Sequence, residues 1–228
     1  MNSQSFFSPA TVVAAGCFFF SPLLIWAWKR VAHLRALGVL ALLAVVLTTS
    51  GCSVALKPQP LASPAQTYTD RIAASPRAEG IDGKVGWGRF TVFYIPLVPV
   101  YIQGDGNTQI MAQVLGALQQ VGYQVEPTDD AGAAATTPTL KVKVEKFWFN
   151  NYTWFFPIVP TWGEVRLTVS LSSRNGNTLW SRDFSGDGST YNFTDGYSIA
   201  ANESMKKILD AMVQEFSSEG FHRALSQT

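Results

Sequence analysis

Strict alternation of apolar and polar residues marks the middle of the chain. Residues 140–145 and 164–171 each carry an aliphatic side chain at every second position, which is typical of strands buried on one face. The pair Asn175-Gly176 follows and favours a two-residue type I′ hairpin turn. Residues 178–185 then return with Trp180 and Phe184 on one face. The pattern predicts a three-stranded meander, followed by a long polar turn over residues 186–196.

Two other segments have the period of amphipathic helices. The first helix is capped by Asp105 or Asn107 and ends at Gly122. The apolar stripes of the two helices are Ile110, Met111, Val114, Leu115, Leu118 and Val121, and Met205, Ile208, Leu209, Met212, Val213 and Phe216. Residues 84–102 are rich in strand formers, but Pro96 and Pro99 restrict the second half to an edge, a bulge or a loop. Residues 123–126 predict one further short strand.

This order of elements predicts an α+β fold over residues 84–228. We expect one mostly antiparallel sheet of about four to five strands, with both helices on one face and the other face open to solvent or to a partner. Residues 52–83 are rich in Pro, Ala, Ser and Gln, and predict a flexible tether without a core of its own.

The first 51 residues have the layout of a secretory signal. Lys29, Arg30 and Arg35 precede an apolar run that ends at Leu47, and the small residues Ser50-Gly51 come directly before Cys52. Cleavage between Gly51 and Cys52 would leave 177 of the 228 residues, enough for one domain.

This stretch, Leu47-Thr48-Thr49-Ser50-Gly51-Cys52, resembles the lipobox of bacterial lipoproteins, with Thr49 where the family most often has Leu. The resemblance implies a diacylglyceryl group on the Cys52 sulfur, cleavage before Cys52 and acylation of the new amino group. Several acyl chains on one residue hold a protein on a bilayer essentially permanently. The alternative is that Cys52 is an ordinary cysteine beside a membrane helix, in a chain that is not lipidated.

An earlier apolar run, residues 11–28, has two interpretations. It is near the length of a transmembrane helix, or it is untranslated sequence that precedes a true start near Val31, so that residues 1–30 come from a mis-assigned start. Ala14-Ala15-Gly16-Cys17 looks like a second lipobox, but no basic residue precedes it.

Composition narrows the chemistry of the mature chain. The first 51 residues carry three basic residues and no acidic one, so 14 basic and 16 acidic residues remain, a net charge of −2 that gives no case for nucleic acid. Cys52 is then the sole cysteine and His222, near the end of the chain and expected to be solvated, the sole histidine. This argues against disulfides and zinc, and we expect no metal and no cofactor.

Carboxylates remain as candidates for catalysis or for calcium. Asp105, Asp187 and Asp195 lie beside glycines and are expected to form turns, because the spaced ligands of a calcium loop are absent. A carboxylate-based envelope hydrolase is the alternative to a non-enzymatic protein, and it predicts a cleft lined by Asp or Glu with raised pKa values; Glu126 and residues 129–130 are the acidic group to consider.

The mature domain resembles known envelope proteins. A strand-helix half, the meander TLKVKVEKF…EVRLTVSLSSRNGNTLWSRDFSG and a final helix look like the small YajG-type bacterial lipoproteins, over about residues 84–225. More distantly, the layout is similar to the amino-terminal domain of TolB and to lipoproteins of the curli-secretion type. The resemblance implies a non-catalytic domain that faces the periplasm. Ser53, in place of the Asp that commonly retains lipoproteins in the inner membrane, implies the outer membrane.

Two uncharged segments are the candidate interaction surface. Residues 95–101 and 156–162 share the order apolar, Pro, aliphatic, Val, Pro, any residue, aromatic, and the second ends an aromatic loop predicted over residues 146–163. The candidate residues are Ile95, Leu97, Val98, Tyr101, Trp154, Phe155, Phe156, Ile158 and Trp162. They form a satellite core, a surface for an envelope protein, or a surface for the bilayer. We expect the two segments to lie side by side at one end of the sheet.

Overall fold

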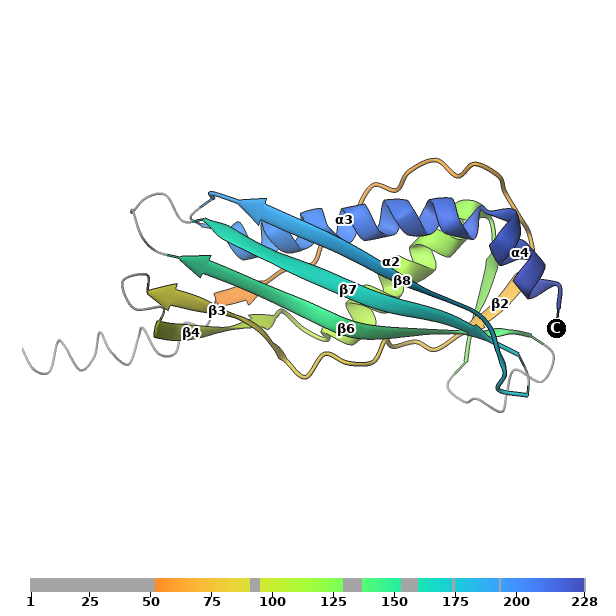
Figure 1. Ribbon diagram of the computed structural model, residues 1–228, viewed down its shortest axis with the longest axis horizontal. Helices are drawn as coiled ribbons and strands as arrows, with labels where there is room; N and C mark the ends of the chain where they lie inside the picture. Colours follow the sequence, from red (N-terminus) through yellow and green to blue (C-terminus); the bar gives the residue numbers. More distant parts are fainter. Residues whose placement is uncertain are drawn as a thin grey trace, which may run out of the picture. The chain divides into compact units, whose positions relative to one another are not determined.

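The computed structural model describes residues 52–90, 95–128, 137–152, 160–173, 175–192 and 194–227, which belong to the second of two units of the chain, Gly51–Thr228. The strands are β1 (Cys52–Val54), β2 (Arg71–Ala74), β3 (Lys84–Phe90), β4 (Ile95–Ile102), β5 (Gln124–Pro127), β6 (Thr139–Tyr152), β7 (Thr161–Ser172) and β8 (Thr178–Thr190). The helices are α2 (Gly106–Val121), α3 (Gly196–Phe216) and α4 (Glu219–Leu225) (Figure 1).

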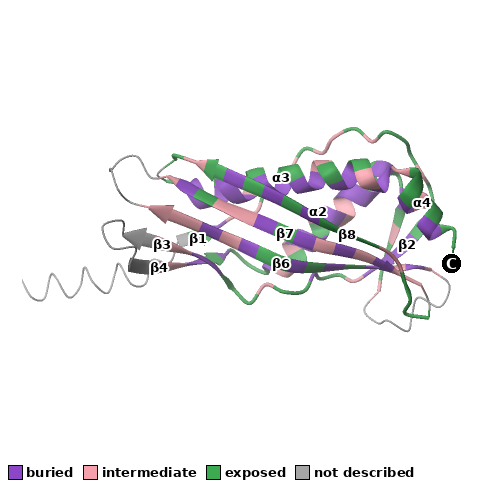
Figure 2. Ribbon diagram, viewed as in Figure 1, coloured by how far each residue is buried: buried purple, intermediate pink, exposed green. Residues whose placement is uncertain are grey.

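The predicted meander is confirmed. β6 pairs antiparallel with β7 from Thr139↔Ser172 to Asn151↔Thr161, and β7 pairs antiparallel with β8 along its whole length. Alternation along β6 and β7 sends aliphatic side chains to one face, where Val165, Leu167 and Val169 are fully buried. Lysines and Arg166 occupy the opposite face and are exposed (Figure 2).

One edge of β6 is shared by several segments from earlier in the chain. β2 pairs with it in parallel at Thr139 and Leu140, Glu79 bridges to Lys143, and β3 pairs with it in parallel from Phe149 to Tyr152. β5 continues the sheet beyond β2, while β4 and then β1 continue it beyond β3. The chain from β2 to β3 therefore runs alongside β6 in the same direction.

Both long helices bury their predicted stripes in the same core as the inner face of the sheet. α3 packs on β8, β7 and β6, and α2 packs on α3 and β5 (Figure 1). Two strand glycines bring α3 close to β8: a Cβ at Gly186 would lie 2.2 Å from the Ser204 carbonyl oxygen, and one at Gly188 1.9 Å from that of Ala200. The glycines thus allow backbone-to-backbone packing that any side chain would prevent.

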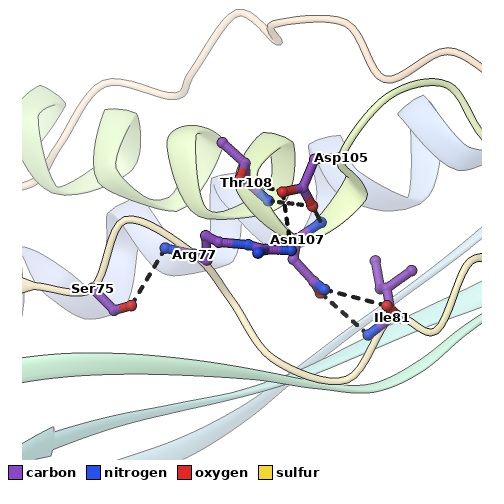
Figure 3. Close-up of polar contacts among 6 residues, drawn as sticks. All are labelled: Ser75, Arg77, Ile81, Asp105, Asn107 and Thr108. Carbon is purple, nitrogen blue, oxygen red and sulfur yellow. Dashed lines mark hydrogen bonds and ion pairs between the residues drawn. The ribbon is translucent and has the colours of Figure 1, made fainter. Parts of the chain in front are cut away.

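The start of α2 is held by two polar side chains (Figure 3). Asp105 is the N-cap, as predicted, and its carboxylate accepts hydrogen bonds from the backbone N–H groups of Asn107 and Thr108. Arg77 forms an ion pair with Asp105 at 3.0 Å. The Asn107 amide exchanges two hydrogen bonds, each of 3.2 Å, with the backbone of Ile81. Gly122, with φ 110°, ends the helix as predicted.

The α+β class is confirmed, but the expected sheet is too small. The described residues form an eight-stranded sheet that is mixed rather than mostly antiparallel, because β1, β2, β3 and β5 all join it through parallel pairs. β3 and β4 pair antiparallel, with register shifts after Lys84 and after Gly88. A short third helix, α4, was not predicted.

The predicted flexible tether over residues 52–83 is wrong. Two of the strands, β1 and β2, lie in it, and Ile72 of β2 is fully buried between β5 and β6. These strands have few large apolar residues, so their own composition does not reveal that the rest of the chain covers them. Among the described residues, no helix is both long and apolar enough to span a membrane.

Candidate functional site

Cys52, the predicted lipidation residue, is the first residue of β1. It pairs in parallel with Val100 of β4, Ser53 pairs with Tyr101, and Val54 pairs with Ile102. The predicted anchor is therefore adjacent in the sheet to the first of the two proline segments, residues 95–101 (Figure 1).

The chain after β1 is fixed to α3. The Ser198 hydroxyl accepts a hydrogen bond from the Ala55 N–H at 3.1 Å, and Asn202 binds the same stretch on both sides of its amide. Its oxygen accepts from the Lys57 N–H at 2.8 Å and its nitrogen donates to the Ala55 carbonyl at 2.8 Å. Residues 52–57 are thus held within the fold by a helix about 145 positions later.

The described parts of the two proline segments start from the same end of the sheet but are not adjacent. Arg89 of β3 pairs with both Pro96 of β4 and Tyr152 of β6, and the Tyr152 N–H donates to the Pro160 carbonyl at 3.1 Å. β3 and β6 therefore lie between β4 and the described part of the second segment, residues 160–162; residues 156–159 lie outside the described residues, so the side-by-side arrangement stays a prediction. Trp154, Phe155, Phe156 and Ile158 lie outside the described residues.

The prolines of β4 lie in an edge-like part of the strand, which is one of the positions that the sequence predicts for them. β1 pairs with β4 only from Val100 onward, after Pro99. Ile95, Leu97 and Val98 precede that point, and among the described strands this part of β4 pairs with β3 alone. A residue without an N–H donor is accepted at such a one-sided position.

Most of the predicted aromatic loop is strand. β6 continues to Tyr152 and β7 begins at Thr161, because Phe147 and Phe149 keep alternating with outward residues and are both buried. A register shift near Glu145 precedes them.

Outward-facing aromatic residues at this end of the sheet form what we call the aromatic band: Trp87, Tyr101, Trp148, Tyr152 and Trp162. Trp162 and Tyr101 are 40% and 46% exposed, and the other three are half-buried. The rings of Tyr152 and Trp162 stack with centroids 4.6 Å apart. The Lys84 ammonium lies 4.4 Å from the centre of the Trp87 ring and 5.8 Å from that of Trp148, so it binds the two rings on one side of the sheet.

The sequence identified only two members of this band as site residues, Tyr101 and Trp162. The sequence pattern predicts a loop at Trp148 and Tyr152. It predicts a strand at Trp87 but does not indicate which face of the sheet Trp87 lies on. The alternation of side chains along a strand is the signal that locates them. Phe147 and Phe149 are buried, so the even-numbered Trp148 and Tyr152 lie on the opposite face of β6.

The carboxyl groups with altered pKa values have lowered ones, so they stay ionised and do not act as proton donors. A hydrogen bond from the Thr108 hydroxyl lowers the pKa of Asp105, and hydrogen bonds from Lys146 and Arg166 lower the pKa of Glu164. Glu126 is exposed and forms an ion pair with Arg71 at 3.4 Å; residues 129–130 lie outside the described ranges. In the described part of the chain, no three His, Cys, Asp or Glu side chains gather in a group able to hold a metal ion.

His222 is not the solvated terminal residue that the sequence suggested. Its ring stacks on Tyr68 with centroids 4.3 Å apart, and its Nδ1 lies 3.2 Å from the Asp70 carboxylate. These contacts attach α4 to the segment before β2, which is a structural role.

Pockets on the described surface include two near the residues discussed above. One lies between residues 56–61, α2 and α3, and its lining is apolar with three glutamines and no titratable group. The other lies beside the aromatic band, where Lys84, Lys146 and Trp148 line it together with Asp82 and Glu145. The first pocket therefore has no group for acid–base catalysis. The second has two positive and two negative side chains beside the half-buried Trp148 ring.

The comparisons with known proteins identify the class of fold. No family model and no curated protein matches the chain. Among solved structures, it is similar to protein XCC0632 from Xanthomonas campestris, of the family model DUF330, at a TM-score of 0.54 and 13% identity over 78% of this chain and 100% of that chain. At this identity the likeness shows the fold alone.

Two bacterial lipoproteins are also among the structural neighbours. They are lipoprotein GNA1162 from Neisseria meningitidis (TM-score 0.30, 16% identity, 54% of this chain and 85% of that chain) and a minor lipoprotein from Acinetobacter baumannii (TM-score 0.32, 12% identity, 74% and 94%). Both likenesses are too distant to support an argument. The lipobox at Cys52 stays a prediction from the sequence.

Proposed function

We propose that this chain is a non-enzymatic lipoprotein of the bacterial envelope, anchored through acylated Cys52 in the outer membrane and facing the periplasm. It acts there as an accessory or assembly protein for another envelope protein. One observation carries the proposal: the folded unit begins at Gly51, and its first strand begins at Cys52. The expected cut between Gly51 and Cys52 thus lies within one residue of the start of this unit and directly before β1.

The site chemistry agrees with a binding role. The sheet face that no described helix covers presents aromatic rings and charged side chains, and the carboxyl groups with altered pKa values, Asp105 and Glu164, are held ionised. A hydrolase that works with carboxylates needs one with a raised pKa as its acid. No observation on the described residues favours that alternative over a binding protein.

Palmitate labelling in a Gram-negative host tests the anchor. The wild-type chain should incorporate labelled palmitate, and Cys52→Ala should abolish incorporation and leave an uncleaved precursor. Cys17→Ala is the matched control, because Cys17 is the chain's other cysteine and should be dispensable. Undiminished labelling of Cys52→Ala would overturn the proposal.

Two further measurements test the location and the role. Ser53→Asp should move the lipidated protein from the outer- to the inner-membrane fraction on a density gradient; an unchanged distribution would contradict the sorting argument. Chemical crosslinking in intact envelopes should join the wild-type protein to an envelope protein, and a chain that crosslinks to none would contradict an accessory role.

A further inference from the structure

The aromatic band lies on the sheet face that no described helix covers, at the end where Cys52 begins β1. We propose that this band rests in the headgroup region of the same bilayer that holds the acyl chains of Cys52. The inference rests on the proposed function, because it requires a lipid on Cys52, and it adds a second contact surface between the domain and the membrane.

Strand register places the band beside the anchor. A single row of paired residues runs across the sheet from Cys52 through Val100, Gly86 and Phe149 to Gly163. Each residue of the aromatic band lies one to three positions along its own strand from the residue that belongs to this row. At about 4.8 Å per strand, β3 with Trp87 lies about 10 Å from β1, and β7 with Trp162 about 19 Å.

The structure leaves no slack between the anchor and the sheet. Cys52–Val54 are themselves a strand, and the Gln103 N–H donates to the Val54 carbonyl at 2.9 Å where the strand ends. Ala55 follows and is bound to Ser198 of α3. A lipid on Cys52 therefore holds β1 itself at the bilayer surface, and at this end of the sheet the strands from β4 to β7 cannot lie more than about 20 Å from that surface.

The chemistry of the uncovered face changes along the strands in the way that a bilayer surface demands. At the Cys52 end it carries the aromatic band and Lys84, whose ammonium lies beside the Trp87 and Trp148 rings and supplies the positive charge that a lipid phosphate binds. Trp and Tyr are the residues enriched at membrane–water interfaces. Further along β6 and β7 the same face carries exposed Lys141, Lys143 and Arg166, which stay in water.

A cysteine-protection experiment tests the contact. The acylated thiol of Cys52 does not react with maleimide and the mature chain has no other cysteine, so one introduced cysteine reports alone. The full chain carrying Trp162→Cys is expressed, purified in its palmitate-labelled form and reconstituted into vesicles of phosphatidylethanolamine and phosphatidylglycerol. Labelling by a membrane-impermeant maleimide is then compared between vesicles and detergent.

Lys141→Cys is the matched control. Lys141 is exposed on the same face of the sheet as Trp162, but it pairs with Ser170 at the other end of β6. We expect labelling of Trp162→Cys to fall several-fold in vesicles, relative to detergent, while that of Lys141→Cys stays unchanged. Tyr101→Cys is a second site for the same test, should Trp162→Cys lose its native circular dichroism spectrum.

The possible failures are distinguishable. A wild-type chain without palmitate refutes the proposed anchor itself. A palmitate-labelled Trp162→Cys that reacts equally in vesicles and in detergent overturns the membrane contact and leaves the anchor intact. Protection that persists in detergent, with disulfide crosslinking between two copies, also overturns it and assigns the band to an interface between copies.

Discussion

Replacing Ile72 by alanine tests whether residues 52–83 belong to the folded core. Ile72 is fully buried in β2, where it pairs with Val125 of β5 while neighbouring Ala73 pairs with Thr139 of β6. The change removes three carbon groups, worth about 0.8 kcal/mol each, or about 2.4 kcal/mol of transfer free energy. The cavity left behind brings the expected loss of stability to about 3–4 kcal/mol.

Thermal unfolding of the purified protein, followed by circular dichroism, measures this loss. A destabilisation of that size lowers the melting temperature of a domain of this length by about 6–16 °C. Ile199→Ala, at a half-exposed position on α3, should leave the melting temperature nearly unchanged. If Ile72→Ala melts with the wild type, residues 71–74 are not part of the core and the tether expected from composition is correct after all.

Three further changes test the packing and the caps. Tyr123→Phe removes the buried hydroxyl that donates to the Phe216 carbonyl at 3.0 Å, and should cost about 1–3 kcal/mol in urea unfolding; an unchanged midpoint would contradict that bond. Asp105→Ala should lower the melting temperature above pH 3.8, and the difference should vanish as the pH falls through the lowered pKa of the folded state, because protonation then ends the capping; a pH-independent difference would count against it. Gly188→Ala forces α3 away from β8 and should lower the melting temperature sharply, whereas Gly116→Ala, with open space around its Cβ, should not; equal effects would refute the close packing.

Local pattern was enough to predict the meander and the helices. The aliphatic alternation of β6 and β7 and the buried stripe from Met205 to Phe216 appear in the structure as the sequence indicates. Each of these signals arises within a few residues of chain, and each element buries one face by itself. The α+β class followed from them.

Partners distant in sequence explain what was missed. β2 is short and contains Ile72 as its one large apolar residue, so only its parallel neighbours β5 and β6 make it a strand. Gly186 and Gly188 suggested a turn, yet they are strand residues whose missing side chains admit α3. No local pattern shows which distant backbone will approach.

The candidate site was predictable in its parts but not in its assembly. The lipobox-like stretch before Cys52 is a local motif, and the aromatic composition of residues 147–162 is visible in the sequence. That Cys52 lies beside Val100 depends on the pairing of β1 with β4, which is a register between segments about 48 positions apart. The sequence therefore predicted an anchor and an apolar surface, but it did not predict that the two lie close together.

On the proposed route, the hydrogen bonds between the chain after β1 and α3 have a consequence for the order of events during export. Residues 52–57 would leave the translocation channel well before Ser198 and Asn202, to which the Ala55 and Lys57 backbone is bound. A pairing so far apart in sequence forms late in folding. On the proposed route, acylation of Cys52 meets a strand whose partner helix has not yet crossed the membrane. On that route Cys52 is exposed to the modifying enzymes before α3 can close the fold beside it, so the distance in sequence between residue 52 and α3 separates modification from folding.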